Sequence, residues 1–155
     1  MLIETAHIKK LKFLLFQTLS DILISEFILL FGRGFMSKRI LLCDDSAFIR
    51  MMMKDILNRN GYEVCGEAAD GLQAAQRYEE LKPDLVLLDT VMPETDGAGA
   101  LAKIKAFDPD AAVIILFADG ERKAACECVK AGARGTIVKP FKTEQVLEEI
   151  KRVIG

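Results

Sequence analysis

The feature that most constrains this chain is a regular alternation of short apolar runs with amphipathic stretches, which begins near residue 38 and continues to the end. The apolar runs lack the polar alternation of half-exposed strands, which is typical of strands buried on both faces. We predict strands at 39–43, 63–68, 85–88, 112–117 and 136–138, and helices at 46–59, 71–81, 97–106, 121–131 and 143–154.

Repetition of strand and helix in this way predicts a parallel sheet with right-handed crossovers. Five such units within residues 36–155 have the size of the flavodoxin-like doubly wound α/β fold, a five-stranded parallel sheet in the order 2-1-3-4-5 with five helices. We therefore expect one domain at 36–155, preceded by a short N-terminal helical extension at 1–35.

The extension differs in character from the rest of the chain. Residues 13–31 contain 13 apolar residues in 19, interrupted by Asp21 and Glu26, and basic residues flank both sides. The cost of inserting the two acids nearly offsets the gain from the apolar residues, so membrane insertion of this segment is close to energetically balanced. One interpretation is that the segment forms an anchor or partner-docking helix. The other is that residues 1–35 are translated from an upstream start and carry no function, since Met36 resembles a natural protein start. We expect membrane contact only if residues 13–31 act as an anchor.

Charge and cysteine content narrow the class of protein. The formal net charge is −2 and the chain has no dense basic cluster, so we expect no nucleic-acid partner. The cysteines form no CxxC pair, and the only histidine is His7. We expect a cytoplasmic protein in which the cysteines are small core residues; they are Cys43, Cys65, Cys126 and Cys128.

Charged side chains stand where three of the predicted strands end. Asp44 and Asp45 follow the first strand, Asp89 the third and Lys139 the fifth. Function in a doubly wound sheet gathers at these carboxyl ends. Three carboxylates there would repel one another unless a cation lies among them, and oxygen ligands alone favour Mg²⁺. A carboxylate on a metal is also a competent nucleophile toward an activated phosphoryl group. A flavin site is not expected, because no Ser/Thr/Gly-rich phosphate loop follows the first strand.

Four segments of the chain resemble the response-regulator receiver family. They are Asp-Asp-Ser-Ala-Phe-Ile-Arg at 44–50, Pro-Asp-Leu-Val-Leu-Leu-Asp at 83–89, Met-Pro-Glu-Thr-Asp-Gly at 92–97, and Lys-Ala-Gly-Ala through Val-Lys-Pro-Phe at 130–141. The first segment is most similar to the stand-alone chemotaxis branch, which is called CheY-like. The resemblance covers residues 38–154.

The resemblance implies a role for each matching residue. Asp89 would be the phosphoacceptor and one ligand of Mg²⁺. Asp45 would ligate Mg²⁺ directly and Asp44 through water, with the Val91 backbone carbonyl as a further ligand. Lys139 would contact the phosphoryl group, and the bond to the following proline would be cis. The donor would be a sensor histidine kinase carrying phosphohistidine, so self-catalysed aspartyl phosphorylation is the only catalysis expected.

Two positions depart from the family pattern. The family carries Ser or Thr at the end of the fourth strand, where its hydroxyl bonds a phosphoryl oxygen, and this position is Phe117 here. The family's switch aromatic on the fifth strand falls at Thr136. A lost hydrogen bond to a charged partner costs roughly 1.5–3 kcal/mol, so coupling should weaken. Either Thr136 partly replaces the missing hydroxyl or the domain switches poorly. Ala118 is small, as the family expects, so access to Asp89 should stay open.

The leading hypothesis is a stand-alone response regulator of a two-component phosphorelay, in chemotaxis or motility. Because the chain ends directly after the helix at 143–154, we expect no attached output domain and a protein target such as a flagellar motor component or a phosphatase. The alternative is a receiver-fold interaction module with impaired switching. The expected partner face joins the helix at 121–131, the strand at 136–138 and the helix at 143–154; it includes Cys126, Lys130, Arg134, Thr136 and Lys142.

Overall fold

A computed structural model describes residues 17–18, 22–23 and 37–155 of the chain. The chain divides into two units, Met1–Ser37 and Lys38–Gly155. Most of the candidate anchor at 13–31 lies outside the described residues, as does most of the expected extension at 1–35. Within the part that the structure describes, no helix has both the length and the apolar character needed to cross a membrane.

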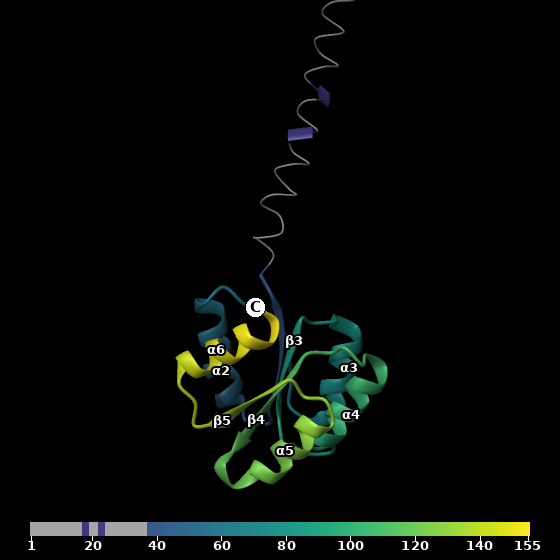
Figure 1. The fold of residues 1–155 in the computed structure, drawn as a ribbon, viewed down its shortest axis with the longest axis vertical. Helices are drawn as coiled ribbons and strands as arrows, with labels where there is room; N and C mark the ends of the chain where they lie inside the picture. The colour runs from purple at the N-terminus through teal and green to yellow at the C-terminus, as the bar shows by residue number, and fades with distance from the viewer. Residues whose placement is uncertain (1–16, 19–21, 24–36) are drawn as a thin grey trace, which may run out of the picture. The chain divides into compact units, whose positions relative to one another are not determined.

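The second unit is built on a five-stranded parallel sheet with the order β2-β1-β3-β4-β5 (Figure 1). The strands are β1 (Arg39–Cys43), β2 (Glu63–Ala68), β3 (Leu85–Asp89), β4 (Val113–Ala118) and β5 (Gly135–Lys139). The predicted fold and strand order are confirmed, and every predicted strand boundary is met to within one residue.

Five helices connect and cover these strands. They are α2 (Ala47–Arg59), α3 (Gly71–Leu81), α4 (Gly97–Phe107), α5 (Arg122–Lys130) and α6 (Thr143–Ile154), with a short 3₁₀ turn η1 (Asp119–Glu121) before α5. The first three begin behind a polar side chain that accepts a backbone N–H of the first turn, an ordinary N-cap; these caps are Ser46, Asp70 and Asp96.

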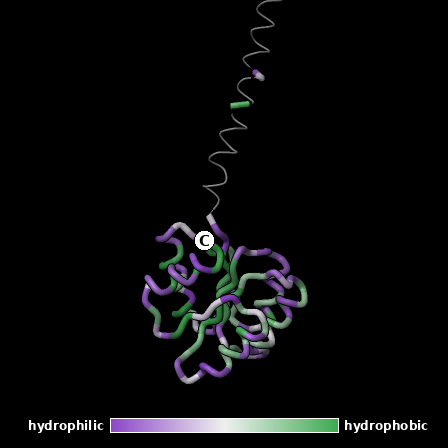
Figure 2. The backbone as a smooth tube through the Cα atoms, viewed as in Figure 1, coloured by the Kyte–Doolittle hydropathy of each residue, from purple (hydrophilic) through white to green (hydrophobic). Residues whose placement is uncertain are grey.

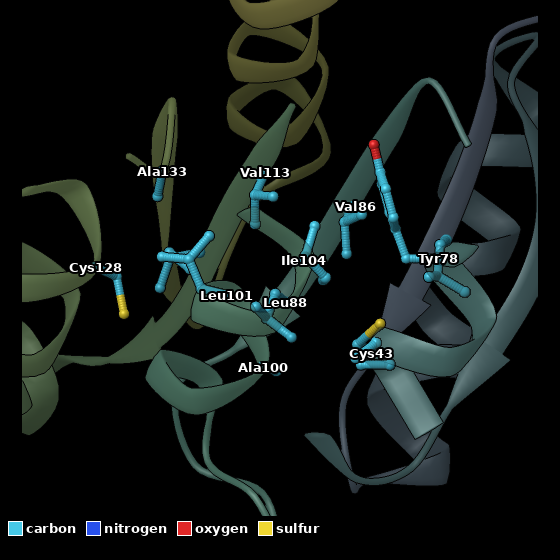
Figure 3. Packing of buried hydrophobic residues seen from close by; sticks show 14 of the residues in the cluster. Cys43, Tyr78, Val86, Leu88, Ala100, Leu101, Ile104, Val113, Cys128 and Ala133 are labelled. Carbon is cyan, nitrogen blue, oxygen red and sulfur yellow. The ribbon is translucent and has the colours of Figure 1, made fainter. Parts of the chain in front are cut away.

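The sheet is buried on both faces, and the two faces carry separate apolar cores. α2 and α6 cover one face, while α3, α4 and α5 cover the other (Figure 1). Successive strand residues point to opposite faces, so neighbouring residues of β3 such as Leu87 and Leu88 belong to different cores. The strands form the most hydrophobic part of the domain (Figure 2). Figure 3 shows how the α3–α4–α5 core closes over Val86, Leu88 and Val113.

Two of the four cysteines, Cys43 and Cys128, follow the expectation of a core position. Cys43 and Cys128 are buried and Cys65 is half-buried. For Cys126 the expectation is wrong, because this side chain is exposed. Cys126 lies two residues before the buried Cys128 on α5, and residues two apart on a helix do not share a face.

Candidate functional site

The acidic residues predicted at the strand ends do come together. Asp44 and Asp45 follow β1 and Asp89 ends β3, and these two strands are neighbours in the sheet. One carboxylate oxygen from each of the three lies within 4.8 Å of the others. Asp44 and Asp89 are buried, whereas Asp45 is exposed to solvent.

Lys139, at the end of β5, reaches across β4 to these carboxylates. Its Nζ atom lies 2.6 Å from Asp44 Oδ2 and 3.0 Å from Asp89 Oδ1. Its side chain is itself largely buried, so one ammonium group compensates two buried carboxylates. The Lys139–Pro140 bond is cis, as the resemblance implied. We call Asp44, Asp45, Asp89 and Lys139 the acidic edge.

Burial and the neighbouring charges have opposing effects on the pKa of Asp89 and on the pKa of Lys139. Removal from water raises the pKa of Asp89 to about 6, the nearby Asp44 and Glu121 add to the increase, and Lys139 opposes it. For Lys139, burial lowers the pKa, but hydrogen bonds to Asp44 and Asp89 outweigh burial and hold the pKa above its ordinary value. In the absence of a second cation, the edge therefore carries more negative charge than its lysine fully compensates.

The donor chemistry of the acidic edge fits a hard cation. All three candidate side-chain ligands are carboxylates, and the described part of the chain places no histidine or thiolate among them. Two oxygens on opposite sides of a Mg²⁺ ion lie about 4 Å apart, so small side-chain adjustments bring these oxygens to ligand distance. The exposure of Asp45 leaves an open side for water and for a phosphoryl group.

Backbone and side-chain contacts hold the loop after β1 in place. The Ser46 N–H donates to Asp44 Oδ1 at 2.9 Å. The Arg50 guanidinium donates to the carbonyl of Asp44 at 2.7 Å and to that of Asp45 at 3.3 Å. Arg50 is held in turn by an ion pair with Glu67 at 3.1 Å. The two aspartates are therefore oriented by a cation that does not itself contact their carboxylates.

The segment after Asp89 is fixed by its contact with the start of α4. The Gly97 N–H donates to the Thr90 carbonyl at 3.0 Å. A side chain at Gly97 would collide with the backbone of Asp89 and Thr90, so this position requires glycine. Val91, whose carbonyl the resemblance implied as a ligand, lies in this turn with an exposed side chain.

The residues of the expected switch lie on the neighbouring strands. Phe117 is buried in the α3–α4–α5 core, and Ala118 is exposed at the end of β4 beside Lys139. Thr136 is half-buried and paired with Ile115, three residues before Lys139 on β5. We call Phe117, Ala118 and Thr136 the switch region. Successive residues of a strand are about 3.3 Å apart along its axis. Thr136 therefore lies well away from the acidic edge, toward the start of β5.

A surface pocket of about 450 Å³ opens beside the switch region. It is lined by Phe117, Arg122, Ala125, Cys126, Val129, Lys130 and Thr136. The pocket gathers three residues of the expected partner face, namely Cys126, Lys130 and Thr136. It does not include Arg134 or Lys142, so only part of that face forms one hollow.

Sequence reasoning missed three residues that the structure brings to the site. Arg50 was recognised only as part of a motif, and its contacts to the carbonyls of the β1 loop were not expected. Thr90 and Glu121 were not singled out at all. The Thr90 hydroxyl donates to the Glu121 carboxylate at 2.5 Å, and the Ala118 N–H donates to the same carboxylate at 2.9 Å. The only sequence signal was an acid three residues after the end of a strand, which is common at helix starts.

Comparison with known proteins gives a consistent answer. The model of the response regulator receiver domain matches residues 40–151. The chain is 48% identical over 118 residues to a chemotaxis protein CheY of Thermotoga maritima, covering 76% of this chain and 98% of that protein. It is 48% identical to the CheY of Bacillus subtilis, covering 77% and 100%. Among solved structures, a CheX–CheY–BeF₃–Mg²⁺ complex from Borrelia burgdorferi is 33% identical with a TM-score of 0.73, covering 76% of this chain and 90% of that one.

Proposed function

The chain belongs to the response regulator receiver domain family, and from that premise we propose that Asp89 accepts a phosphoryl group in a Mg²⁺-dependent reaction. Members of this family are signalling proteins of two-component phosphorelays rather than classical enzymes. The observation that carries the proposal is the acidic edge itself, in which Lys139 contacts both Asp44 and Asp89.

Asp89 is the proposed nucleophile. A carboxylate oxygen of Asp89 attacks the phosphorus of a phosphohistidine on a sensor histidine kinase. The bond between phosphorus and the imidazole nitrogen breaks, its electron pair returns to the ring, and the ring leaves neutral when its other nitrogen carries a proton. Asp89 becomes an acyl phosphate.

Asp44, Asp45, Asp89 and the Val91 carbonyl are the residues that would hold the ion. Bound there, Mg²⁺ would neutralise negative charge on the attacking carboxylate and on the phosphoryl oxygens. Lys139 would hold a phosphoryl oxygen as a point charge, and its contact with Asp89 at 3.0 Å supports this role. The Arg50 contacts keep the two aspartates of the β1 loop oriented during the transfer.

The proposed output is a protein contact in chemotaxis or motility. The first support is the similarity to CheY proteins over three quarters of the chain. The second is the pocket beside the switch region, with Arg122 and Lys130 at a largely apolar hollow. One relative is named for chemotaxis and another was solved in complex with CheX, which supports a protein as the target. The kind of target that we propose is a motor component or a phosphatase.

A receiver-fold interaction module with impaired switching is the second candidate. The specific observation in its favour is that Phe117 is buried in the core and offers no hydroxyl to a phosphoryl group. The position of Thr136, opposite Ile115, also argues against the idea that Thr136 replaces that hydroxyl. In this candidate the phosphate would be accepted but weakly transmitted.

The domain boundaries remain part of the proposal. We assign the receiver to residues 36–155 and treat residues 1–35 as an extension that contacts a membrane only if residues 13–31 act as an anchor. Fractionation of the native protein separates these alternatives, because an anchored protein sediments with membranes and a merely extended one does not.

The experiment that tests the phosphoacceptor uses acetyl phosphate and intact mass measurement of the full chain. We expect a mass gain of one phosphoryl group that requires Mg²⁺ and disappears in Asp89→Asn. Asp110→Asn, at an exposed aspartate away from the acidic edge, is the matched control and should be phosphorylated normally. No mass gain in folded protein would refute the proposed acceptor and favour a module that signals without phosphate.

A further inference from the structure

One carboxylate of the β4–α5 segment has no place in the phosphoacceptor chemistry described above. Glu121 Oε2 accepts the Thr90 hydroxyl at 2.5 Å and the Ala118 N–H at 2.9 Å. Thr90 is buried directly after Asp89, and Ala118 is paired in the sheet with Lys139. A single oxygen of Glu121 therefore accepts hydrogen bonds from two donors, one next to the proposed phosphoacceptor Asp89 and the other beside Lys139.

Helix capping explains only half of this arrangement. A glutamate at the third position of a helical turn commonly accepts the N–H of the residue before the turn, which accounts for the Ala118 contact. It does not account for the Thr90 hydroxyl, which comes from the residue directly after β3, 31 residues away in sequence. The second contact ties η1 to the residue beside Asp89.

The charge of Glu121 reaches the acidic edge only through space. It makes a minor contribution to the raised pKa of Asp89, after burial and the charge of Asp44. The Thr90 hydroxyl, then the Ala118 N–H, and then the positive charge of Lys139 together hold the pKa of Glu121 below its ordinary value, so Glu121 is ionised at neutral pH. A phosphoryl group on Asp89 would add about two negative charges beside this carboxylate.

We propose that Glu121 is a resting-state latch whose carboxylate holds the Ala118 N–H and the Thr90 hydroxyl that a phosphoryl group on Asp89 would otherwise take. This inference rests on the proposed phosphorylation of Asp89. Phosphorylation and the latch exclude each other, because both need the same donors and both are negatively charged. Release of Glu121 frees η1 from Thr90 and alters the start of α5.

The latch supplies a route for the signal that does not use Phe117. Arg122, the first residue of α5, follows Glu121 and lines the pocket beside the switch region. Movement of Glu121 therefore changes one wall of that pocket directly. The coupling that a hydroxyl at the end of β4 would provide is carried instead by the backbone of η1.

The test compares the binding of beryllofluoride, a phosphoryl mimic, to the full chain and to Glu121→Gln in the presence of Mg²⁺. Glutamine keeps the size and the accepting oxygen of the side chain but removes the charge, so we expect affinity to rise about tenfold or more. Glu127→Gln, on α5 and exposed, is the matched control and should bind as the unchanged protein does. Glu121→Ala guards against a folding defect of the first variant and should also bind more tightly.

A second readout follows the latch itself. In the unchanged protein, the amide resonance of Ala118 should shift strongly when beryllofluoride binds, and the contact between Thr90 and Glu121 should be lost. Equal affinities of the unchanged protein and both Glu121 variants would overturn the latch while leaving phosphorylation of Asp89 intact. Absence of beryllofluoride binding in all of them, together with no phosphorylation by acetyl phosphate, would instead refute the proposed function and the latch with it.

Discussion

The acidic edge and the switch region are neighbours in the sheet, but they differ in how closely their side chains match the receiver family pattern. The acidic edge has every side chain that the receiver family pattern implies there. Lys139 contacts Asp44 and Asp89, and the three carboxylates lie within 4.8 Å of one another. In the switch region the family pattern is exchanged, because the aromatic side chain is on β4 and the hydroxyl side chain is on β5. Phe117 fills the core and Thr136 leaves a pocket at the surface.

This difference separates the chemistry of phosphorylation from its transmission. The acidic edge depends on charges held at short distance in a buried place, where the loss of one group is costly. The switch region depends on packing, and an exchange of a large for a small side chain can be compensated nearby. A receiver can therefore keep its phosphoacceptor while its signal takes another route, and the route that we propose for this chain runs through Glu121 and η1.

The largest expected effect comes from Lys139→Met, which removes the cation of the acidic edge and keeps the length of the side chain. Two buried carboxylates then lose their partner, and we expect the free energy of unfolding to fall by about 4 kcal/mol without metal. Mg²⁺ should restore part of this loss, because it supplies the missing positive charge. Urea denaturation with and without Mg²⁺ measures both.

Lys123→Met is the control for this substitution. Lys123 is exposed on α5, so the change should cost little and should not alter the response to Mg²⁺. If the two lysine variants lost the same stability, the acidic edge would be no more sensitive than ordinary surface charge, and the contrast between the two regions would fail.

The next effect concerns the missing hydroxyl and uses Phe117→Thr with Phe117→Val as its partner. Threonine and valine have the same shape, and each should cost about 3 kcal/mol of stability by leaving space in the core. Only threonine offers a hydroxyl at the end of β4, so only Phe117→Thr should bind beryllofluoride more tightly, by about tenfold. Calorimetric titration with Mg²⁺ present gives the two affinities.

A double variant sharpens the same comparison. Adding Thr136→Tyr to Phe117→Thr places an aromatic ring beside the space that was emptied, and should recover about 1 kcal/mol of the lost stability through renewed burial.

Identical affinities of the single variants Phe117→Thr and Phe117→Val for beryllofluoride would mean that the position of Phe117 does not contact the phosphoryl site. The switch region would then be a matter of packing alone.

The fold could be predicted from the sequence because its signal is local. β1, β3 and β4 are largely apolar runs and the helices have their own periodicity, so errors stayed within one residue at every boundary. The proximity of Asp44, Asp89 and Lys139 followed from topology, since the carboxyl ends of parallel strands meet at one edge. No side-chain detail was needed for either inference.

The parts that could not be predicted depend on side-chain direction over long separations. The contact of Thr90 with Glu121 joins residues in two irregular segments, where no periodicity fixes the orientation of either side chain. The exposure of Cys126 depends on which face of the short helix α5 is turned toward the sheet, and the apolar composition of that helix does not determine this face. The pocket beside Thr136 is lined by side chains of α5 together with Phe117 and Thr136, and the space between side chains of separate elements leaves no pattern in the sequence.

The smallest expected effect lies at the outer side of the switch region, where Glu149 of α6 supports the edge strand. β5 has a neighbour on one side only, and Glu149 Oε1 accepts the N–H of Thr136 at 3.0 Å. Arg152 pairs with the same carboxylate at 2.6 Å, and this hydrogen bond is the main reason that the pKa of Glu149 lies below its ordinary value. The ionised carboxylate is therefore the form that stabilises the fold.

Glu149→Gln should cost about 1 kcal/mol at pH 7, since a neutral amide accepts more weakly from both partners. A lowered pKa means that this stabilisation is fully present above about pH 4.3, the value of an unfolded glutamate, and is lost as the pH falls through the folded value. The difference between variant and unchanged protein should therefore narrow below about pH 4, measured by urea denaturation across the range. Glu148→Gln, one residue away and exposed, should show no such convergence. A constant difference at all pH values would mean that shape rather than charge holds the β5 edge, and the switch region would then rest on packing throughout.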